Sequence, residues 1–445
     1  MRMLITGGRV IDPASDIDRS ADIVVDAGRI VSVNEPGQTP VGSFDRVIDA
    51  GGCWVVPGLI DMHVHFRDPG QEYKEDIFTG CESAAAGGFT AVCCMPNTMP
   101  VIDTPEKIKY VLQKAGNANG VRVLQTGAIT VGQRGKELTD FAALKKAGAA
   151  AVTEDGHSVS SVKLMREALR KAAALGLPVL DHTEQPEIRD AGCVHRGTAA
   201  GLTGLPGIPE EAESMIAIRD MLLAEETGGA IHLQHISTSE SLELIRMAKK
   251  RGIKATAETA PHYFTLTDED IIVGGNSKGN YHRCKSPKGA TVDTHRKMNP
   301  PLRSARDRQA VIDALMDGTL DAIATDHAPH SIEEKSREFI KAPFGVIGLE
   351  TSFAMSNKVL VHDNGMSPSR LIELMSANPA KILGCGGGTL APGTRADIAV
   401  LDPDEVWTVP ASGFRSKSEN TPFAGAEVRG AVVMTIAGGN VIFER

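Results

Sequence analysis

The sequence has 445 residues, of which 42% are hydrophobic and 23% charged, as in a folded globular protein, and this length allows a large domain with a smaller companion. The formal net charge of −9 argues against nonspecific nucleic-acid binding, which needs a basic surface. No signal peptide or membrane-spanning stretch is recognisable, and seven scattered cysteines without a Cys-x-x-Cys motif predict reduced thiols in a cytoplasmic protein.

The two ends of the chain share a β-rich texture. Residues 1–55 contain short strand-like runs separated by turn residues, namely MLITGGRVI, ADIVVDAGRIVSV and RVIDAGGCWVV. Residues 386–445 repeat that texture in ADIAVLD and AEVRGAVVMTIAGGNVIFER. We therefore expect both ends to assemble into one small β-sandwich domain, with residues 56–385 forming a separate catalytic domain.

That middle region alternates strand-like and helix-like segments. The expected strands are GLIDMHVHF, FTAVCCMP, VRVLQTGAI, AAVTED, LPVLDHTE, AIHLQHIS, IKATAETAP and LDAIATDHAP. Amphipathic segments with charged residues at helical spacing lie between them. Eight such repeats predict an α/β fold of the TIM-barrel, (β/α)8, type. A doubly wound open sheet is the alternative, but no Gly-x-Gly-x-x-Gly follows the first strand.

Polar residues stand at the ends of several of these apolar strands. The two-residue period of a strand places His63, His65 and Arg67 on one face. Further polar residues end the fourth, fifth, sixth and eighth strands, and these are Asp155, His182, His235 and Asp326. In a barrel the carboxyl ends of the strands meet at one mouth, where active sites lie.

Imidazoles and carboxylates without cysteine suit Zn²⁺ or a similar divalent metal ion. A single His-x-His can arise by chance or as satisfied core histidines. Several buried polar groups without a common ligand would each cost about 1–3 kcal/mol, so a metal site is favoured.

Four histidines and two aspartates exceed the need of one tetrahedral ion and match two ions with a bridging ligand. We expect His63, His65 and Asp326 on the first ion, His182 and His235 on the second, and Asp155 between them. Two ions about 3.5–4 Å apart would make a shared water acidic enough to supply hydroxide near neutral pH. Asp326 would accept the proton of the attacking nucleophile and deliver it to the leaving nitrogen of an amide.

The motifs that carry these residues resemble those of dihydroorotase, in particular the longer bacterial class of this amidohydrolase family. The resemblance rests on PGLIDMHVHFRDPG at 57–70, MPNTMP at 95–100, DHTE at 181–184, QHIST at 234–238, NPPLR at 299–303 and ATDHAPH at 324–330. It implies a zinc enzyme that uses two ions per subunit, held by the same six metal ligands. It also implies substrate-binding roles for Arg67, Asn97, Asn299 and His330. Arg67 would hold the carboxylate of the substrate bidentately.

Rival interpretations stay open for individual residues. Arg67 could instead pair with Asp68 or another acid at the mouth. Asn97 and Asn299 lie close to prolines and could serve turn formation alone. Asn299 also lies near the end of the long polar segment 274–303, and a loop of that length is usually functional or mobile.

Rival functions stay open as well. Related hydantoinases and allantoinases resemble this chain at His63 and His65, but generally bridge their metals with a carboxylated lysine at the end of strand four. Here Asp155 holds that place, with Glu154 as an alternative that a regular strand would turn to the opposite face. Metal-binding scaffolds that only assemble with partners form another rival class. The resemblance further implies a homo-oligomer such as a dimer, with possible association with aspartate carbamoyltransferase, and the segment 331–345 could close over bound substrate or remain a surface loop.

Overall fold

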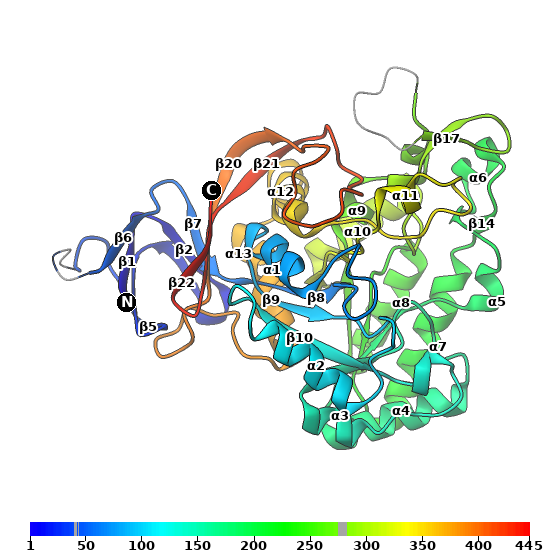
Figure 1. The fold of residues 1–445 in the computed structure, drawn as a ribbon, viewed down its shortest axis with the longest axis horizontal. Helices are drawn as coiled ribbons and strands as arrows, with labels where there is room; N and C mark the ends of the chain where they lie inside the picture. The colour runs from blue at the N-terminus through cyan, green and yellow to red at the C-terminus, as the bar shows by residue number, and fades with distance from the viewer. Residues whose placement is uncertain (40–41, 43, 275–282) are drawn as a thin grey trace.

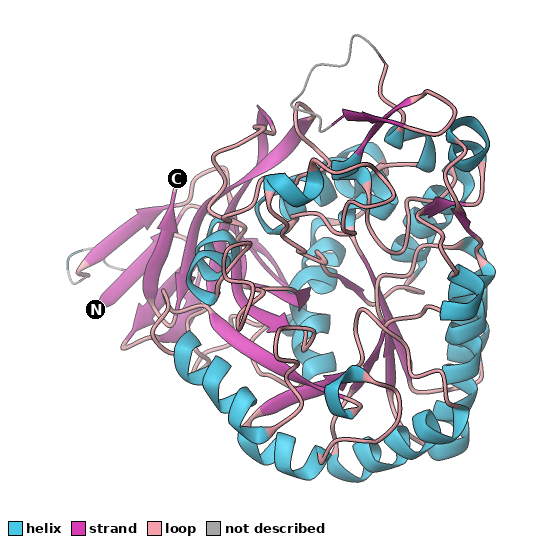
Figure 2. Cartoon of the chain, turned by 45° about the vertical axis from the view of Figure 1, so that its right-hand side comes forward, coloured by secondary structure: helices cyan, strands magenta, loops and turns pink. Residues whose placement is uncertain are grey.

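A barrel of parallel strands surrounded by helices adjoins two smaller sheets built from both ends of the chain (Figures 1 and 2). The structure is a computed structural model and describes residues 1–39, 42, 44–274 and 283–445. The predicted α/β class, the eight-stranded barrel and the additional sheet domain are confirmed.

The barrel is an eight-stranded parallel sheet in which neighbours along the chain are neighbours in space. Its strands are β8 (Leu59–Val64), β9 (Phe89–Cys94), β10 (Arg122–Ala128), β11 (Ala149–Thr153), β12 (Val179–Asp181), β15 (Ile231–Leu233), β16 (Ala255–Thr259) and β19 (Ala322–Ile323). The segment that follows β19 meets the end of β8 through a parallel bridge between His327 and Val64. The buried carboxylate of Asp61 strengthens this closure, because it accepts hydrogen bonds from the backbone nitrogen and the hydroxyl of Thr325.

Helices after the strands cover the outside of the barrel (Figure 2). The longer ones are α1 (Ile77–Ala86), α2 (Pro105–Ala115), α3 (Phe141–Ala147), α4 (Val162–Leu175), α7 (Glu211–Thr227), α8 (Ser239–Lys250) and α10 (Ala305–Asp317). Shorter ones are α5 (Pro186–Arg189), α6 (Thr198–Thr203), α9 (Pro261–Thr265), α11 (Ile332–Lys335), α12 (Ser352–Ser356), α13 (Pro368–Ile372) and α14 (Asn378–Leu383).

Helix α4 illustrates why these segments fold as they do. The Ser161 hydroxyl caps its first turn, satisfying a backbone N–H that the helix leaves free. Gly176 ends it in the left-handed conformation, with φ of 61°, which glycine adopts without steric cost. Between these signals, a stripe at helical spacing is buried against the barrel: Met165, Ala168, Leu169 and Ala172.

The terminal segments form two sheets that share an apolar core. One sheet contains β5 (Arg29–Asn34), β4 (Asp22–Asp26), β1 (Arg2–Thr6) and β6 (Arg46–Asp49). The other contains β22 (Asn440–Glu444), β21 (Glu427–Ala437), β20 (Ile398–Thr408), β7 (Trp54–Pro57), β2 (Arg9–Asp12) and β3 (Ile17–Ser20). Buried Met3, Ile23 and Ile436 belong to one core cluster, so both ends contribute to it. This sheet membership supports the boundaries 1–55 and 386–445 that we propose, with β7 extending two residues past the first.

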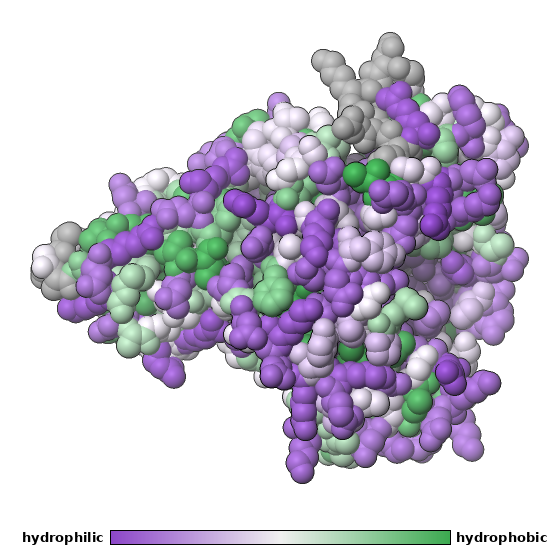
Figure 3. All heavy atoms as spheres, in the orientation of Figure 1, coloured by the Kyte–Doolittle hydropathy of each residue, from purple (hydrophilic) through white to green (hydrophobic). Residues whose placement is uncertain are grey.

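Two short elements fall within the long polar segment. β17 (Arg283–Lys285) pairs with β18 (Thr291–Asp293) as an antiparallel ribbon, while residues 275–282 of the predicted functional or mobile loop lie outside the described residues. The molecular face in Figure 3 is largely hydrophilic, with hydrophobic side chains in small groups. Within the described residues, no helix has both the length and the apolar character needed to cross a membrane.

Candidate metal centre and substrate pocket

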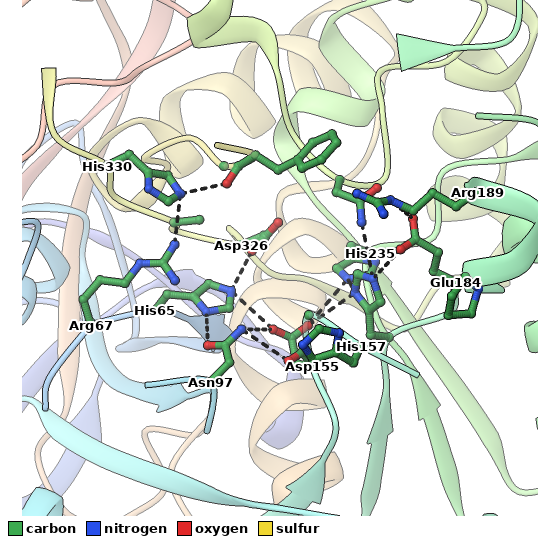
Figure 4. A pocket seen from close by; sticks show the side chains of 17 residues that line it. His65, Arg67, Asn97, Asp155, His157, Glu184, Arg189, His235, Asp326 and His330 are labelled. Atoms are coloured by element: carbon green, nitrogen blue, oxygen red, sulfur yellow. Dashed lines mark hydrogen bonds and ion pairs between the residues drawn. The ribbon is translucent and has the colours of Figure 1, made fainter. Parts of the chain in front are cut away.

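A pocket of about 310 Å³ opens at the carboxyl ends of the barrel strands. Nine of the predicted site residues line it: His65, Arg67, Asn97, Asp155, His182, His235, Asn299, Asp326 and His330. Most of them converge on one centre in Figure 4. His63 is fully buried directly behind this surface. The structure therefore brings all the sequence-predicted site residues into one place.

Several of these side chains are positioned by residues at the strand ends that have positive φ values. β8 ends at Val64 and β15 at Leu233, so most of the site lies just beyond regular strand. Among the described residues, Arg67, His235 and Asp326 have positive φ values of 58°, 39° and 48°. Non-glycine residues rarely adopt this region, and such strain gathers at functional sites. Arg67 therefore reaches the pocket through a left-handed turn and not through the strand alternation that we expected.

Asp155 is the centre of the cluster. Its Oδ1 lies 3.3 Å from His63 Nε2, 3.5 Å from His182 Nδ1 and 3.8 Å from His235 Nε2. Its Oδ2 lies 3.5 Å from His65 Nε2. One carboxylate thus faces all four histidines, which is the placement that a bridging ligand requires.

Asp326 completes one side of this cluster. Its Oδ1 lies 3.1 Å from His65 Nε2 and 3.6 Å from His63 Nε2. These three residues form a group whose ligand atoms lie within 4.8 Å of one another, and His63, Asp155 and His235 form a second such group. On the far side, His182 Nδ1 lies 2.8 Å from His235 Nε2.

Two histidine ring nitrogens in the cluster have no hydrogen-bond partner among the described residues. His63 Nε2 and His235 Nδ1 are buried without a hydrogen-bond partner among the described residues, and such groups are costly to bury. The His63 nitrogen points at both carboxylates. Imidazole nitrogens and carboxylate oxygens are suitable ligands for zinc, so the residues present fit a divalent metal ion.

The raised pKa values of two histidines also indicate that the cluster stabilises positive charge. Burial opposes protonation of His63, but the charges of Asp155 and Asp326 outweigh it and raise the pKa of His63 well above its ordinary value. Burial likewise opposes protonation of His182, yet its hydrogen bonds to Asp155 and Glu184 raise its pKa to about 10. Without metal, protons on these rings balance the buried carboxylates.

Outer residues fix which nitrogen of each ring faces the centre. His63 Nδ1 lies 2.9 Å from Glu258 Oε1, and His65 Nδ1 lies 2.9 Å from Asn97 Oδ1. Because both oxygens accept, each Nδ1 carries the proton and each Nε2 is left for the cluster. Such partners orient metal ligands and raise their basicity. Asn97 also donates to Asp155 Oδ2 at 3.1 Å, so its amide supports the centre while lining the pocket.

The residues beside Asp155 exclude the other bridging candidates. The Glu154 carboxylate turns away and accepts from the backbone nitrogen of Thr130 at 2.9 Å, as a regular strand predicts. Lys145 and Lys146 lie in α3 with exposed side chains. Neither can supply a carboxylated lysine at the end of β11.

Arg67 is available for an anionic ligand. Its neighbour Asp68 pairs with Lys114 Nζ at 2.7 Å, which removes the expected rival for Arg67. Within the described residues, no carboxylate lies within 4.0 Å of the Arg67 guanidinium; instead its Nε donates to the Pro329 carbonyl at 3.2 Å. Burial lowers its pKa from the ordinary value, and a bound anion would restore the stability of the charged form.

His330 and Asn299 complete the walls. His330 Nε2 lies 2.8 Å from the Phe344 carbonyl, and burial lowers the pKa of His330 to about 3, so the ring is neutral. Asn299 Nδ2 lies 3.5 Å from His182 Nε2, and its Oδ1 is buried without a partner among the described residues. Asn299 therefore offers a free acceptor at the pocket, although it lies within the polar segment 274–303.

Sequence reasoning missed several pocket residues. Glu184 Oε2 lies 3.7 Å from His182 Nε2, and its other oxygen lies 3.4 Å from Arg189 Nε. Glu184 stands two residues after His182, and His65 stands two residues after His63. This spacing could have identified Glu184 as a pocket residue from the sequence. Arg189 lies in the four-residue α5 and offered none. Phe344 and Gly345, from the segment 331–345, also line the pocket.

These pKa shifts predict that metal uptake releases protons. Metal-binding imidazoles must be neutral, whereas the raised pKa values keep His63 and His182 protonated at pH 7 without metal. We expect release of about two protons per chain at pH 7, an apparent affinity that weakens as pH falls, and fewer protons released near pH 10. Calorimetry of zinc binding in buffers of different ionisation enthalpy measures this number. His182→Gln should lower it and His330→Asn should not; zinc uptake without proton release in the wild type would contradict the prediction.

Comparison with known proteins finds relatives along the whole chain. The family described as Dihydro-orotase-like matches residues 52–241, and the family described as Amidohydrolase family matches residues 339–443. The dihydroorotase of Geobacter metallireducens is 48% identical over 445 residues, covering 100% of both chains. That of Trichlorobacter lovleyi is 46% identical over 443 residues, covering 100% of this chain and 99% of the relative.

Solved structures share the fold. The L-hydantoinase (dihydropyrimidinase) from Arthrobacter aurescens superposes with a TM-score of 0.85 at 28% identity, covering 99% of this chain and 96% of that one. The dihydropyrimidinase from Brevibacillus agri gives a TM-score of 0.83 at 22% identity, covering 100% of this chain and 95% of that one. The second likeness concerns the fold alone.

Proposed function

The chain belongs to the dihydroorotase family of metal-dependent amidohydrolases, and we propose that it catalyses the reversible cyclisation of N-carbamoyl-L-aspartate to L-dihydroorotate. This reaction belongs to the synthesis of pyrimidines. The observation that carries the proposal is the position of Arg67, a buried guanidinium without a carboxylate partner among the described residues, in the same pocket as the histidine and aspartate cluster. Such a pocket suits a cyclic amide that carries a carboxylate.

We propose that the cluster holds two zinc ions. His63, His65 and Asp326 would bind one ion, His182 and His235 the other, and Asp155 both. Two zinc ions, when bound, supply Lewis-acid polarisation of the ring carbonyl and lower the pKa of a water molecule. The contact of Asp155 with all four histidines supports this count.

Asp326 is the proposed general base and acid. Burial alone would raise its pKa, but the neighbouring His63 and His65 outweigh burial and hold the pKa below its ordinary value. The carboxylate is therefore ionised at neutral pH and can accept a proton from the attacking water. It then gives this proton to the ring nitrogen as the amide bond breaks, and the two transfers reverse during cyclisation.

The remaining pocket residues would bind the substrate. Arg67 would hold the carboxylate through two parallel hydrogen bonds, with His330 and Asn97 beside it. The free Oδ1 of Asn299 would accept from a ring N–H. These roles agree with the positions of all four side chains in the pocket lining.

A hydantoinase-like activity is the second candidate, because the solved structures described above include hydantoinases. The uncharged ring of hydantoin or allantoin offers no carboxylate to Arg67. The test is hydrolysis of L-dihydroorotate, hydantoin and allantoin by the zinc-loaded protein. Turnover of dihydroorotate alone supports the proposal, a preference for the uncharged rings favours the second candidate, and inactivity on all three favours a scaffold role.

We also propose that the protein is a cytoplasmic homodimer that docks to aspartate carbamoyltransferase. Seven free cysteines agree with a reducing compartment. Three of the exposed residues of α7 are apolar, namely Met215, Ile218 and Leu222, and a two-fold dimer can use one such stripe on both copies. Light scattering of the wild type and of Ile218→Asp, with and without the carbamoyltransferase, tests both associations.

A further inference from the structure

A buried polar network lies behind His330, outside the metal cluster. The His330 imidazole is 6% exposed and forms part of the pocket wall. Its Nε2 donates to the carbonyl of Phe344 at 2.8 Å, since a carbonyl oxygen can only accept. Its backbone nitrogen donates to Oδ1 of Asn420 at 3.2 Å. The ring and the backbone of His330 are thus each held by a group that the proposed chemistry does not use, while Arg67 Nη2 and Lys74 Nζ lie 3.4 Å from its Nε2 and Nδ1.

Asn420 comes from the segment between β20 and β21, which belongs to the terminal sheets in sequence and extends towards the barrel (Figure 1). Its side chain is 2% exposed. Its Nδ2 donates to the carbonyls of Ala328 at 3.2 Å and Gly345 at 3.1 Å, while Oδ1 accepts from His330. Both amide protons and the carbonyl oxygen are therefore used, and Asn420 links three backbone positions around the pocket wall.

Lys335 in α11 holds the same wall from the other side. It is 0% exposed, and within the described residues no carboxylate lies within 4.0 Å of its Nζ. The ammonium donates to the carbonyls of Lys297 at 3.2 Å, Pro343 at 3.0 Å and Gly345 at 2.8 Å. A buried charge without a counter-charge is costly. Three convergent carbonyls offset part of that cost and fix the backbone that supplies them.

The hydrogen bonds of Asn420 and Lys335 meet at the backbone of Gly345. Its carbonyl accepts from both Asn420 and Lys335. Its φ is +130°, and an added Cβ would lie 2.7 Å from the Ala328 Cβ and 3.1 Å from His330 Nε2. The Gly345 backbone is thus packed directly against the imidazole, and a shift of this backbone would move the Phe344 carbonyl that accepts from His330.

We propose that Asn420 and Lys335 are positioning residues that fix the Ala328 and Phe344–Gly345 backbone and thereby hold His330, in its Nε2-protonated form, at the substrate wall. This inference rests on the proposed function in one respect, the placement of the substrate carboxylate beside His330. The segment between β20 and β21 then completes the substrate pocket, although its sequence neighbours form the terminal sheets.

The test compares Asn420→Ala with Asn357→Ala in the zinc-loaded full chain. Asn357 is a matched control, because it is also fully buried and its amide likewise donates to two backbone carbonyls, those of Pro403 and Arg429 at 2.8 and 2.9 Å, which do not line the pocket. We expect Asn420→Ala to raise KM for L-dihydroorotate about tenfold with a smaller change in kcat. Asn357→Ala should leave KM unchanged. Lys335→Met, which keeps the length and removes the donor, should act like Asn420→Ala.

The second readout is independent of turnover. Nitrogen-15 histidine NMR, with His330→Asn for assignment, should give a fixed Nε2–H signal in the wild type and in Asn357→Ala. That signal should shift or broaden in Asn420→Ala. Should that variant not fold, Asn420→Ser and Lys335→Met give the same readouts. An unchanged KM and an unchanged His330 signal would overturn the inference, whereas a changed signal in a protein that does not turn over dihydroorotate would overturn the proposed function and leave the positioning role standing.

Discussion

Asp326→Asn is expected to lower kcat for L-dihydroorotate by about 10²–10⁴-fold, the range that a positioned acid–base group supplies. An amide keeps the size of the side chain and cannot accept the proton of the attacking water. Asp326 Oδ1 also faces His63 and His65, so loss of metal could mimic loss of the base. Steady-state kinetics must therefore be read with the zinc content of each preparation.

A matched control lies at the other end of the same strand, β19. Asp321 precedes β19 at the opposite end of the barrel, where its Oδ2 accepts from Lys249 Nζ at 2.7 Å and from the backbone nitrogen of Ala257 at 2.9 Å. Asp321→Asn should retain kcat once the protein is folded. An Asp326→Asn protein that holds full zinc and keeps kcat within tenfold of the wild type would exclude Asp326 as the proton carrier.

Arg67→Met should weaken kcat/KM for L-dihydroorotate by about 2–5 kcal/mol, or roughly 30-fold to several-thousand-fold, because it leaves a buried carboxylate without its partner. The guanidinium is nine-tenths buried, and its Nε is already held by the Pro329 carbonyl. It is therefore preorganised, and little ordering is needed on binding.

Arg189→Met is the comparison for this variant, since Arg189 is the other arginine lining the pocket and pairs with Glu184 at 3.4 Å. We expect a smaller loss there, because Arg189 already has a carboxylate partner. Equal losses in the two variants would show that general positive charge in the pocket, and not a bidentate contact from Arg67, attracts the substrate. Binding of an uncharged ring should be insensitive to either change.

The fold and the cluster of histidines and aspartates were predictable, because strand-like and helix-like segments alternate regularly along the sequence. Apolar strands alternate with amphipathic helices, and parallel strands of a barrel must end at one mouth. Polar residues at those ends, such as His63, His182 and Asp326, therefore had to meet. Strand length was not predictable: β19 keeps only Ala322 and Ile323 as regular strand, since hydrogen bonds of Asp61 replace part of the ladder there.

Other features depend on contacts that no local pattern encodes. The left-handed backbone of Arg67, with φ of 58°, is one of them. Glu258, which orients His63 and His232 at 2.9 and 3.1 Å, was visible only as a carboxylate inside an apolar strand. Asn420 lies in an ordinary polar loop sequence, and its partners are 75 to 92 residues away. Such long-range hydrogen bonds become apparent only once the chain is folded.

The central claim is a centre of two metal ions that share Asp155, and titration of zinc into the metal-free protein tests it most directly. Turnover of L-dihydroorotate is followed as zinc is added, with bound zinc measured at each point. We expect activity to rise to a plateau at two zinc ions per chain, and we expect Asp155→Ala to lose tight binding of at least one of them. Full activity at one zinc ion per chain, or unchanged binding of two ions in Asp155→Ala, would contradict it.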